Sequence, residues 1–102
     1  MIVSIPHSGT RTLNKILNNG ELQFIHFGDN DLSDLMELCP KRFDMPLRSF
    51  DDVLESWKRR GRDIEDLARR YAEAIDIIAT YPGRIYYHNM RQYPVLVKDG
   101  DY

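Results

Sequence analysis

The stretch "MIVSIPHSGTRTL", residues 1–13, holds the first strand, loop and helix start of the chain. Residues 1–5 form an apolar, largely β-branched run, which is typical of a buried strand. The segment "PHSGT" then combines a proline, a glycine and two hydroxyl residues, which favours a loop. Leu13, Ile16 and Leu17 follow at helical spacing. The sequence therefore predicts a strand, a glycine-bearing loop and a helix in this order.

The alternation of strands and helices continues along the chain. Further strands are expected at residues 22–27, 42–48, 84–90 and 94–99, and helices at residues 31–39, 49–60 and 63–81. Pro46 weakens the third strand, because a proline has no N–H to give to a sheet. Ser49 and Asp63 are each placed to cap a helix. The pattern predicts a single domain over residues 1–102, a three-layer α/β/α fold with a mainly parallel sheet.

Composition is that of an ordinary globular protein. Hydrophobic residues make up 42% of the chain, charged residues 29%, and the formal net charge is −2, so nothing favours nucleic acid or a membrane as partner. No apolar run reaches the roughly 20 residues that span a bilayer, and the cytosol is the expected compartment. Cys39 is the only cysteine and is expected in the core, with no metal site. The basic run at residues 58–62 is expected to be a solvated helix end.

The longest expected helix, over residues 63–81, is amphipathic. One face is expected to carry the apolar residues Ile64, Leu67, Ala68, Tyr71, Ala74, Ile75 and Ile78. On the other face, pairs four residues apart are expected between Glu65 and Arg69 and between Asp66 and Arg70. If the protein forms a homo-oligomer, a large apolar patch on this helix would be the sign of it.

The opening loop is suited to hold an anion. A strand that breaks into a Gly/Ser/Thr turn and feeds a helix directs several backbone N–H groups and the positive helix end to one point, which fits a phosphate or sulfate group. The alternative is a capped helix start, with Ser8 or Thr10 as cap, Gly9 turning the chain, and no ligand. Nucleotide hydrolysis of the GxxxxGK[ST] type is disfavoured, because Thr10 rather than Lys follows Gly9 and no glycine stands five residues earlier.

The segment "PHSGTRTL" resembles the 5′-phosphosulfate-binding loop of sulfotransferases that use 3′-phosphoadenosine 5′-phosphosulfate (PAPS). The family's motif runs P-[KR]-[SG]-G-T-[TR]-x-L. The residues that match it are Pro6, Ser8, Gly9, Thr10 and Leu13, and Arg11 matches the variant with Arg after the Thr. The resemblance implies a P-loop-like fold of the sulfotransferase type, in a chain far shorter than the family's usual members.

A second motif of the family, R-x-P-x-x-x-x-x-S, finds its Arg and Ser in "RSFDDVLES", as Arg48 and Ser56. In the family these two residues grip the 3′-phosphate of the cofactor. Helix geometry fits the pairing on its own terms, because Ser56 lies close to two full turns above the cap at Ser49. Taken singly, Arg48 also suits a surface salt bridge and Ser56 a neutral helix position.

Three histidines are assigned separately. His7 stands where the family has a Lys or Arg that stabilises the departing bridging oxygen, so it is a candidate electrostatic aid, although an imidazole with an ordinary pKa near ~6.5 is mostly neutral at pH 7. His26 ends the second strand, where several family members carry the general base, and Asp29 or Asp31 could serve instead. His88 is expected to form hydrogen bonds within the fold.

Two functions follow from these residues. The first is a small sulfotransferase that passes the sulfuryl group of PAPS to a hydroxyl or amine acceptor, with His7 and His26 as catalytic residues. The resemblance implies that the cofactor is bound by Ser8, Gly9, Thr10, Arg11, Thr12, Arg48 and Ser56. The second is a non-catalytic module that keeps the anion-binding loop for a nucleotide or a protein partner, which the absence of a Lys at position 7 favours.

Overall fold

The computed structural model describes residues 1–18 and 23–92. Four strands and four α-helices follow one another as β1 (Ile2–Ser4), α1 (Thr10–Asn18), β2 (Phe24–His26), α2 (Leu32–Leu38), β3 (Arg42–Leu47), α3 (Phe50–Arg59), α4 (Ile64–Thr80) and β4 (Arg84–Asn89), with a short 3-10 helix η1 (Met90–Gln92) after β4. The strands form one parallel sheet in the order β2-β1-β3-β4. The predicted α/β class with a mainly parallel sheet is confirmed, while the strand expected at residues 94–99 lies outside the described residues.

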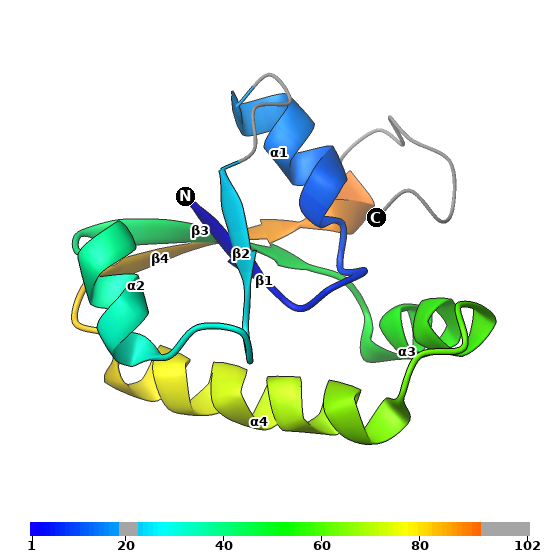
Figure 1. The fold of residues 1–102 in the computed structure, drawn as a ribbon. Coiled ribbons are helices and arrows are strands. Elements are labelled where there is room, and N and C mark those ends of the chain that lie inside the picture. Colours follow the sequence, from blue (N-terminus) through cyan, green and yellow to red (C-terminus); the bar gives the residue numbers. More distant parts are fainter. Residues whose placement is uncertain (19–22, 93–102) are drawn as a thin grey trace.

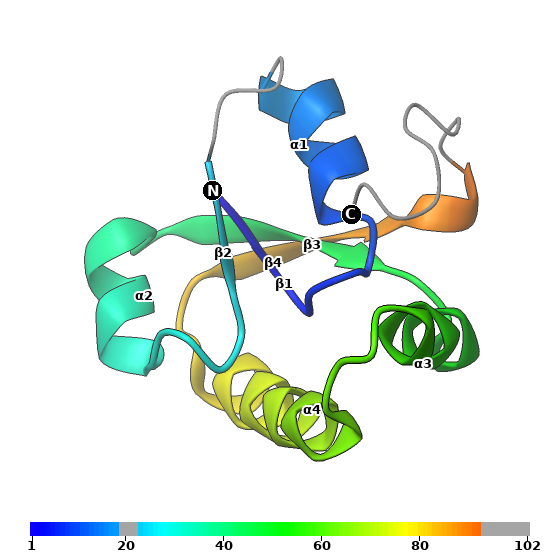
Figure 2. The same ribbon diagram turned by 45° about the vertical axis from the view of Figure 1, so that its right-hand side comes forward.

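Helices cover both faces of the sheet (Figures 1 and 2). Helix α1 lies on one face, and α2, α3 and α4 lie on the other. The main hydrophobic core fills the second face. The sheet side contributes Val3, Ile5 just after β1, Phe43 and Met45, and the helix side contributes Leu35, Val53, Trp57, Leu67, Ala74 and Ile77 together with Cys39, the C-cap of α2. Cys39 is a buried core residue, as expected.

Strand order places a topological switch point between β1 and β3. The chain passes from β1 to one neighbour, β2, and later returns to the other side of β1 as β3. In open α/β sheets, ligands bind outside the carboxyl ends of the strands at such a switch point. The loop at residues 5–9 follows β1, and Arg48 follows β3. The topology thus places the predicted anion loop and Arg48 at the same end of the sheet, beside the switch point.

Pro46 lies in a strand that is interior in the described sheet. Strand β3 pairs with β4 over its whole length but with β1 only through Ile2 and Asp44. The Asp44 N–H donates to the Met1 carbonyl, so the backbone nitrogen of Pro46, two residues on, also faces β1. The Pro46 nitrogen thus faces away from β4, and the missing N–H takes no hydrogen bond from the pairing with β4. It also takes none from the pairing with β1, which ends before Pro46.

The face that α4 buries is expected in part and rotated from the predicted one. Leu67 and Ala74 are buried, and Tyr71 and Ile78 pack against the core, as expected. Ile75, 65% exposed, and Ile64 lie outside, whereas Arg70 and Ile77 are buried. The Arg70 guanidinium reaches the Phe27 carbonyl at 2.8 Å, which turns its side of the helix toward the sheet. An apolar pattern alone does not reveal an arginine that is buried for its hydrogen bonds.

The charged face of α4 is confirmed in part. Asp66 pairs with Arg70 at 3.0 Å as expected, but Arg69 pairs with Asp66 and Glu73. No ion pair joins Glu65 to Arg69 among the described residues. The side-chain hydrogen bonds from Arg70 and Arg69 hold the pKa of Asp66 below its usual range.

An exposed apolar groove runs between α3 and α4. Its volume is about 350 Å³, and it is lined by Phe50, Ile64, Leu67, Ala68, Tyr71, Ala72 and Ile75.

Self-association through the exposed apolar side of α4 stays a prediction. If the protein self-associates there, sedimentation velocity gives a mass above that of one chain, and the Ile75→Glu variant gives the mass of the monomer. A wild-type chain that stays monomeric at high concentration would contradict this expectation.

Among the described residues, none of the helices has the length and apolar character needed to cross a bilayer.

Candidate functional site

The φ angles of the opening loop alternate in sign. His7 and Gly9 have positive φ angles of 69° and 97°, while the ring of Pro6 fixes a negative φ. Alternating residues of this kind turn successive N–H groups into one concavity, which is an anion-binding arrangement. A Cβ at Gly9 would also lie 3.0 Å from Cγ of Met90, so both the φ angle and the close approach call for glycine.

Helix α1 begins without a side-chain cap. The Ser8 hydroxyl donates to the Ile5 carbonyl at 2.5 Å, and the Thr10 hydroxyl pairs with that of Ser4 at 2.6 Å. Neither hydroxyl therefore caps the helix, which removes the alternative in which Ser8 or Thr10 does so. The other three helices are capped, by the side chains of Asp31, Ser49 and Asp63.

The first turn of α1 keeps its donors unused. Within the described part of the chain, no acceptor is bonded to the backbone N–H groups of residues 9–12. The hydroxyl of Thr12, a residue only 4% exposed, has no hydrogen-bond partner among the described residues either. Buried donors of this kind are normally paired, and the helix dipole adds positive potential at the same point. This turn is therefore equipped to hold a negatively charged group, with Arg11 exposed beside it.

The two residues of the second motif, Arg48 and Ser56, both contact His7. Its carbonyl accepts a hydrogen bond from Arg48 at 2.9 Å, and its Nδ1 lies 3.4 Å from the Ser56 hydroxyl. Ser56 is 2% exposed, on the face of α3 that also buries Trp57. The structure thus brings Arg48 and Ser56 together on the anion loop, although they lie in a strand end and a helix far along the chain.

The imidazole of His7 is neutral at pH 7. Burial, followed by the positive charges of Arg62, Arg60 and Arg48, lowers the pKa of His7 to about 4. The ring is 5% exposed and packs edge-on against Trp57, with 6.1 Å between ring centroids. A charged imidazolium at this position is therefore disfavoured as long as the three guanidinium groups surround it.

Arg62 is a site residue that the sequence analysis assigned to a solvated helix end. Its guanidinium lies 4.3 Å from the centroid of Trp57 and donates to Nε2 of His7 at 3.0 Å. Gly61, at a φ of 65°, ends α3 in a Schellman motif, because the Arg62 N–H bonds to the Trp57 carbonyl and the Gly61 N–H to that of Lys58. In this motif the residue after the glycine contacts the helix residue five positions earlier. The spacing of Trp57 and Gly61 in the sequence could therefore have predicted that Arg62 contacts Trp57.

His26 lies at the carboxyl end of β2, directly opposite Ser4 of β1. Burial, the largest cause, lowers the pKa of His26, with Asp29 opposing it. The two alternative bases are engaged elsewhere: Asp29 pairs with Arg70 at 3.0 Å, and Asp31 caps α2. His26 is therefore neutral near pH 7 and able to accept a proton.

The expectation for His88 is confirmed. Its Nε2 lies 2.9 Å from Oδ1 of Asp44 on the neighbouring strand.

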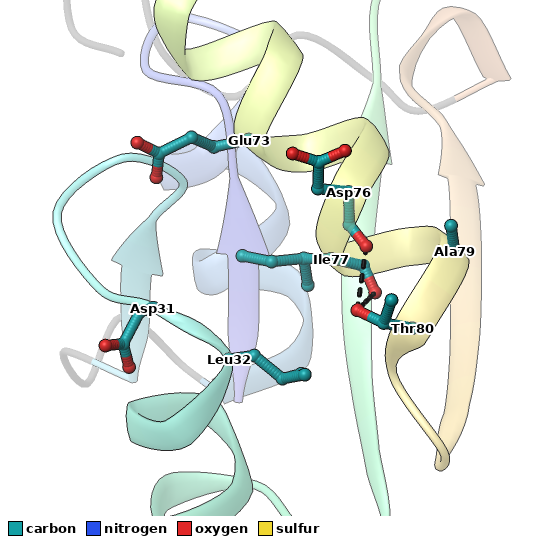
Figure 3. A pocket seen from close by; sticks show the side chains of 7 residues that line it. All are labelled: Asp31, Leu32, Glu73, Asp76, Ile77, Ala79 and Thr80. Atoms are coloured by element: carbon teal, nitrogen blue, oxygen red, sulfur yellow. Dashed lines mark hydrogen bonds between the residues drawn. The ribbon is translucent and has the colours of Figure 1, made fainter.

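A separate cavity lies between α2 and the C-terminal half of α4 (Figure 3). It has a volume of about 500 Å³ and is lined by Asp31, Leu32, Glu73, Asp76, Ile77, Ala79 and Thr80. Three carboxylates and no basic side chain line it, so it repels an anionic ligand. No residue predicted for the cofactor site lies on its walls. Among the described residues, no group of three or more His, Cys, Asp or Glu side chains is placed to hold a metal ion.

No protein-family model, no curated protein and no solved structure matches the chain, and the likeness to PAPS-dependent sulfotransferases therefore rests on its two motifs alone.

Proposed function

We propose that this protein is a small sulfotransferase-like protein that binds PAPS at the start of α1. The observation that carries the proposal is the set of unused donors there, the N–H groups of residues 9–12 and the buried hydroxyl of Thr12. They follow the carboxyl end of β1, beside the switch point of the strand order, where ligands of open α/β sheets bind. A sulfate or phosphate group has the oxygen acceptors and the negative charge that such donors and a helix N-terminus stabilise.

The 3′-phosphate of the cofactor is assigned to Arg48 and Ser56. Both contact His7 of the loop, so both are within reach of a nucleotide whose 5′ end lies on α1. Arg60 and Arg62 are close enough to lower the pKa of His7, and they add positive potential at the same place. A ligand with anionic groups at both ends of its ribose matches this distribution of charge.

The proposed reaction is an in-line transfer to a hydroxyl or amine acceptor. The acceptor atom forms a bond to sulfur while the bond from sulfur to the 5′-phosphate oxygen breaks, and 3′-phosphoadenosine 5′-phosphate (PAP) leaves. The unused N–H groups of α1 stabilise the negative charge that develops on the departing phosphate. The acceptor's proton passes to His26. Burial lowers the pKa of this histidine, so its ring is neutral near pH 7 and has a nitrogen able to accept the proton, although the same burial makes it a weaker base than a solvated histidine.

A second candidate, a non-catalytic nucleotide-binding module, is favoured by one observation. Both ring nitrogens of His7 are engaged, Nε2 by Arg62 and Nδ1 by Ser56. His7 is then a structural part of the nucleotide site and gives no charge to the departing oxygen. The two candidates share the cofactor site and differ only in the transfer step.

Calorimetric titration with PAP, AMP and ATP tests the cofactor site. PAP is expected to bind most tightly. Arg48→Ala should lower the affinity for PAP by about tenfold or more, since a hydrogen bond to a charged group contributes roughly 1.5–3 kcal/mol. Arg84→Ala is the matched control, because it removes the same charge from the start of β4, at the end of the sheet opposite to the carboxyl ends of the strands. Equal binding of the three nucleotides would refute the proposed site.

Incubation with PAPS separates the two candidates. A transferase forms PAP faster when a panel of hydroxyl and amine acceptors is added, and His26→Ala removes that increase while PAP binding is kept. A protein that binds PAP but never forms it from PAPS above the spontaneous rate is the non-catalytic module.

A further inference from the structure

His7, Ser56 and Arg62 form a chain of contacts whose proton positions can be worked out. A guanidinium has only donors, so the Arg62 group that lies 3.0 Å from Nε2 of His7 must donate to it. Nε2 is then an acceptor without a proton. Because a neutral imidazole carries one proton, that proton sits on Nδ1.

The proton on Nδ1 decides the role of Ser56. Nδ1 lies 3.4 Å from the Ser56 oxygen, so the imidazole donates and the serine accepts. The hydroxyl proton of Ser56 is then not used toward His7. Among the described residues no other acceptor is bonded to that hydroxyl, and the usual bond of a helical serine to a carbonyl one turn earlier is not formed.

We infer that His7 is a positioning residue through which Arg62 fixes Ser56 as a hydrogen-bond donor to a phosphate or sulfate ester. The inference rests on the proposed function for the ligand, but the proton positions do not depend on it. The opposite tautomer would make Ser56 donate to His7 and would turn oxygen lone pairs toward the anion. Arg62 prevents this by occupying Nε2, and Trp57 holds Arg62 in place through its ring face.

Nitrogen-15 NMR of the histidine rings tests the proton positions without any ligand. At pH 7, two-bond correlations are expected to show His7 protonated on Nδ1. Arg62→Met, which keeps the aliphatic stem on Trp57 but removes the donor, should shift His7 toward the Nε2 form. Arg60→Met is the matched control, because Arg60 also acts on the His7 charge but forms no hydrogen bond with it among the described residues. A wild-type ring protonated on Nε2, or a tautomer unchanged in Arg62→Met, would overturn the inference.

The ratio of PAP to AMP affinity tests the consequence for the ligand. Ser56→Ala and Arg62→Met should each lower this ratio by about tenfold, the size of one hydrogen bond to a charged group. In the Ser56→Ala background, Arg62→Met should lower it clearly less than in wild type, because the part of its effect that acts through Ser56 is already lost and only the long-range charge of Arg62 remains. Additive losses would make Arg62 a direct ligand and refute the positioning role. If wild-type protein binds PAP and AMP equally, the proposed function fails together with the donor role of Ser56, and the NMR result still judges the action of Arg62 on His7.

Discussion

Trp57→Ala is expected to lower the free energy of unfolding by about 3–5 kcal/mol, the usual cost of removing a large aromatic from a core. Trp57 is fully buried and ties α3 to the anion loop, because its indole N–H donates to the Pro6 carbonyl at 2.9 Å. A domain of this size has a total stability of roughly 5–15 kcal/mol, so the loss is a large fraction of it.

Urea unfolding followed by far-UV circular dichroism measures this loss, since the chain has no other tryptophan. Trp57→Phe isolates the hydrogen bond and should cost about 1–3 kcal/mol, because it leaves the buried Pro6 carbonyl without a donor. Phe50→Ala is the control on the same helix, and since Phe50 is 53% exposed its cost should stay below about 1 kcal/mol. Equal stability of Trp57→Phe and wild type would show that the tie to Pro6 contributes nothing.

Acidification from pH 6.5 to pH 4 is expected to destabilise the protein by about 2–3 kcal/mol through His7 alone. The pKa of His7 is about 4 in the folded protein, compared with about 6.5 in an unfolded chain. The unfolded state therefore binds a proton in this window while the folded state does not, so stability falls as the pH falls and is fully present above pH ~6.5. His26, whose pKa burial also lowers, acts in the same direction.

The free energy of unfolding at pH 7, 6, 5 and 4 gives the slope. His7→Asn is the control, because asparagine tolerates the left-handed backbone at this position and does not titrate. Its profile should be flatter than that of wild type between pH 6.5 and 4. Asp66 contributes little to this slope. Its pKa is lowered in the folded protein, so the stability that it contributes is lost mainly as the pH falls below the usual pKa of an aspartate. Parallel profiles for wild type and His7→Asn would show that the slope does not come from His7.

Local signals in the sequence account for most of the fold. Ser49 and Asp63 cap helices as expected, and Pro40 follows the last residue of α2 and its C-cap, Cys39. These features depend on neighbours within a few residues, and so they can be predicted. The interior position of β3 depends instead on which strands pair, and no local pattern around Pro46 contains that information.

The candidate site divides in the same way. The gathering of Arg48 and the opening loop follows from parallel strands that end at one edge, and was predictable. The unused donors of α1 were not, because they depend on the hydroxyls of Ser8 and Thr10 bonding to β1 and the residue after it. Nor was the low pKa of His7, which depends first on its burial and then on guanidinium groups brought together from the segments that follow β3 and α3.

The acidic cavity has a consequence for how a ligand arrives. Its carboxylates belong to Asp31, which caps α2, and to the second half of α4. The three arginines that act on His7, Arg48, Arg60 and Arg62, lie in the segments just before and after α3, a helix drawn on the opposite side of the ribbon from α2 (Figure 1). The net charge of −2 therefore describes neither place, since acidic side chains line the cavity and three guanidinium groups surround the anion loop. An approaching anion is expected to be repelled from the cavity and attracted to the loop before any contact forms.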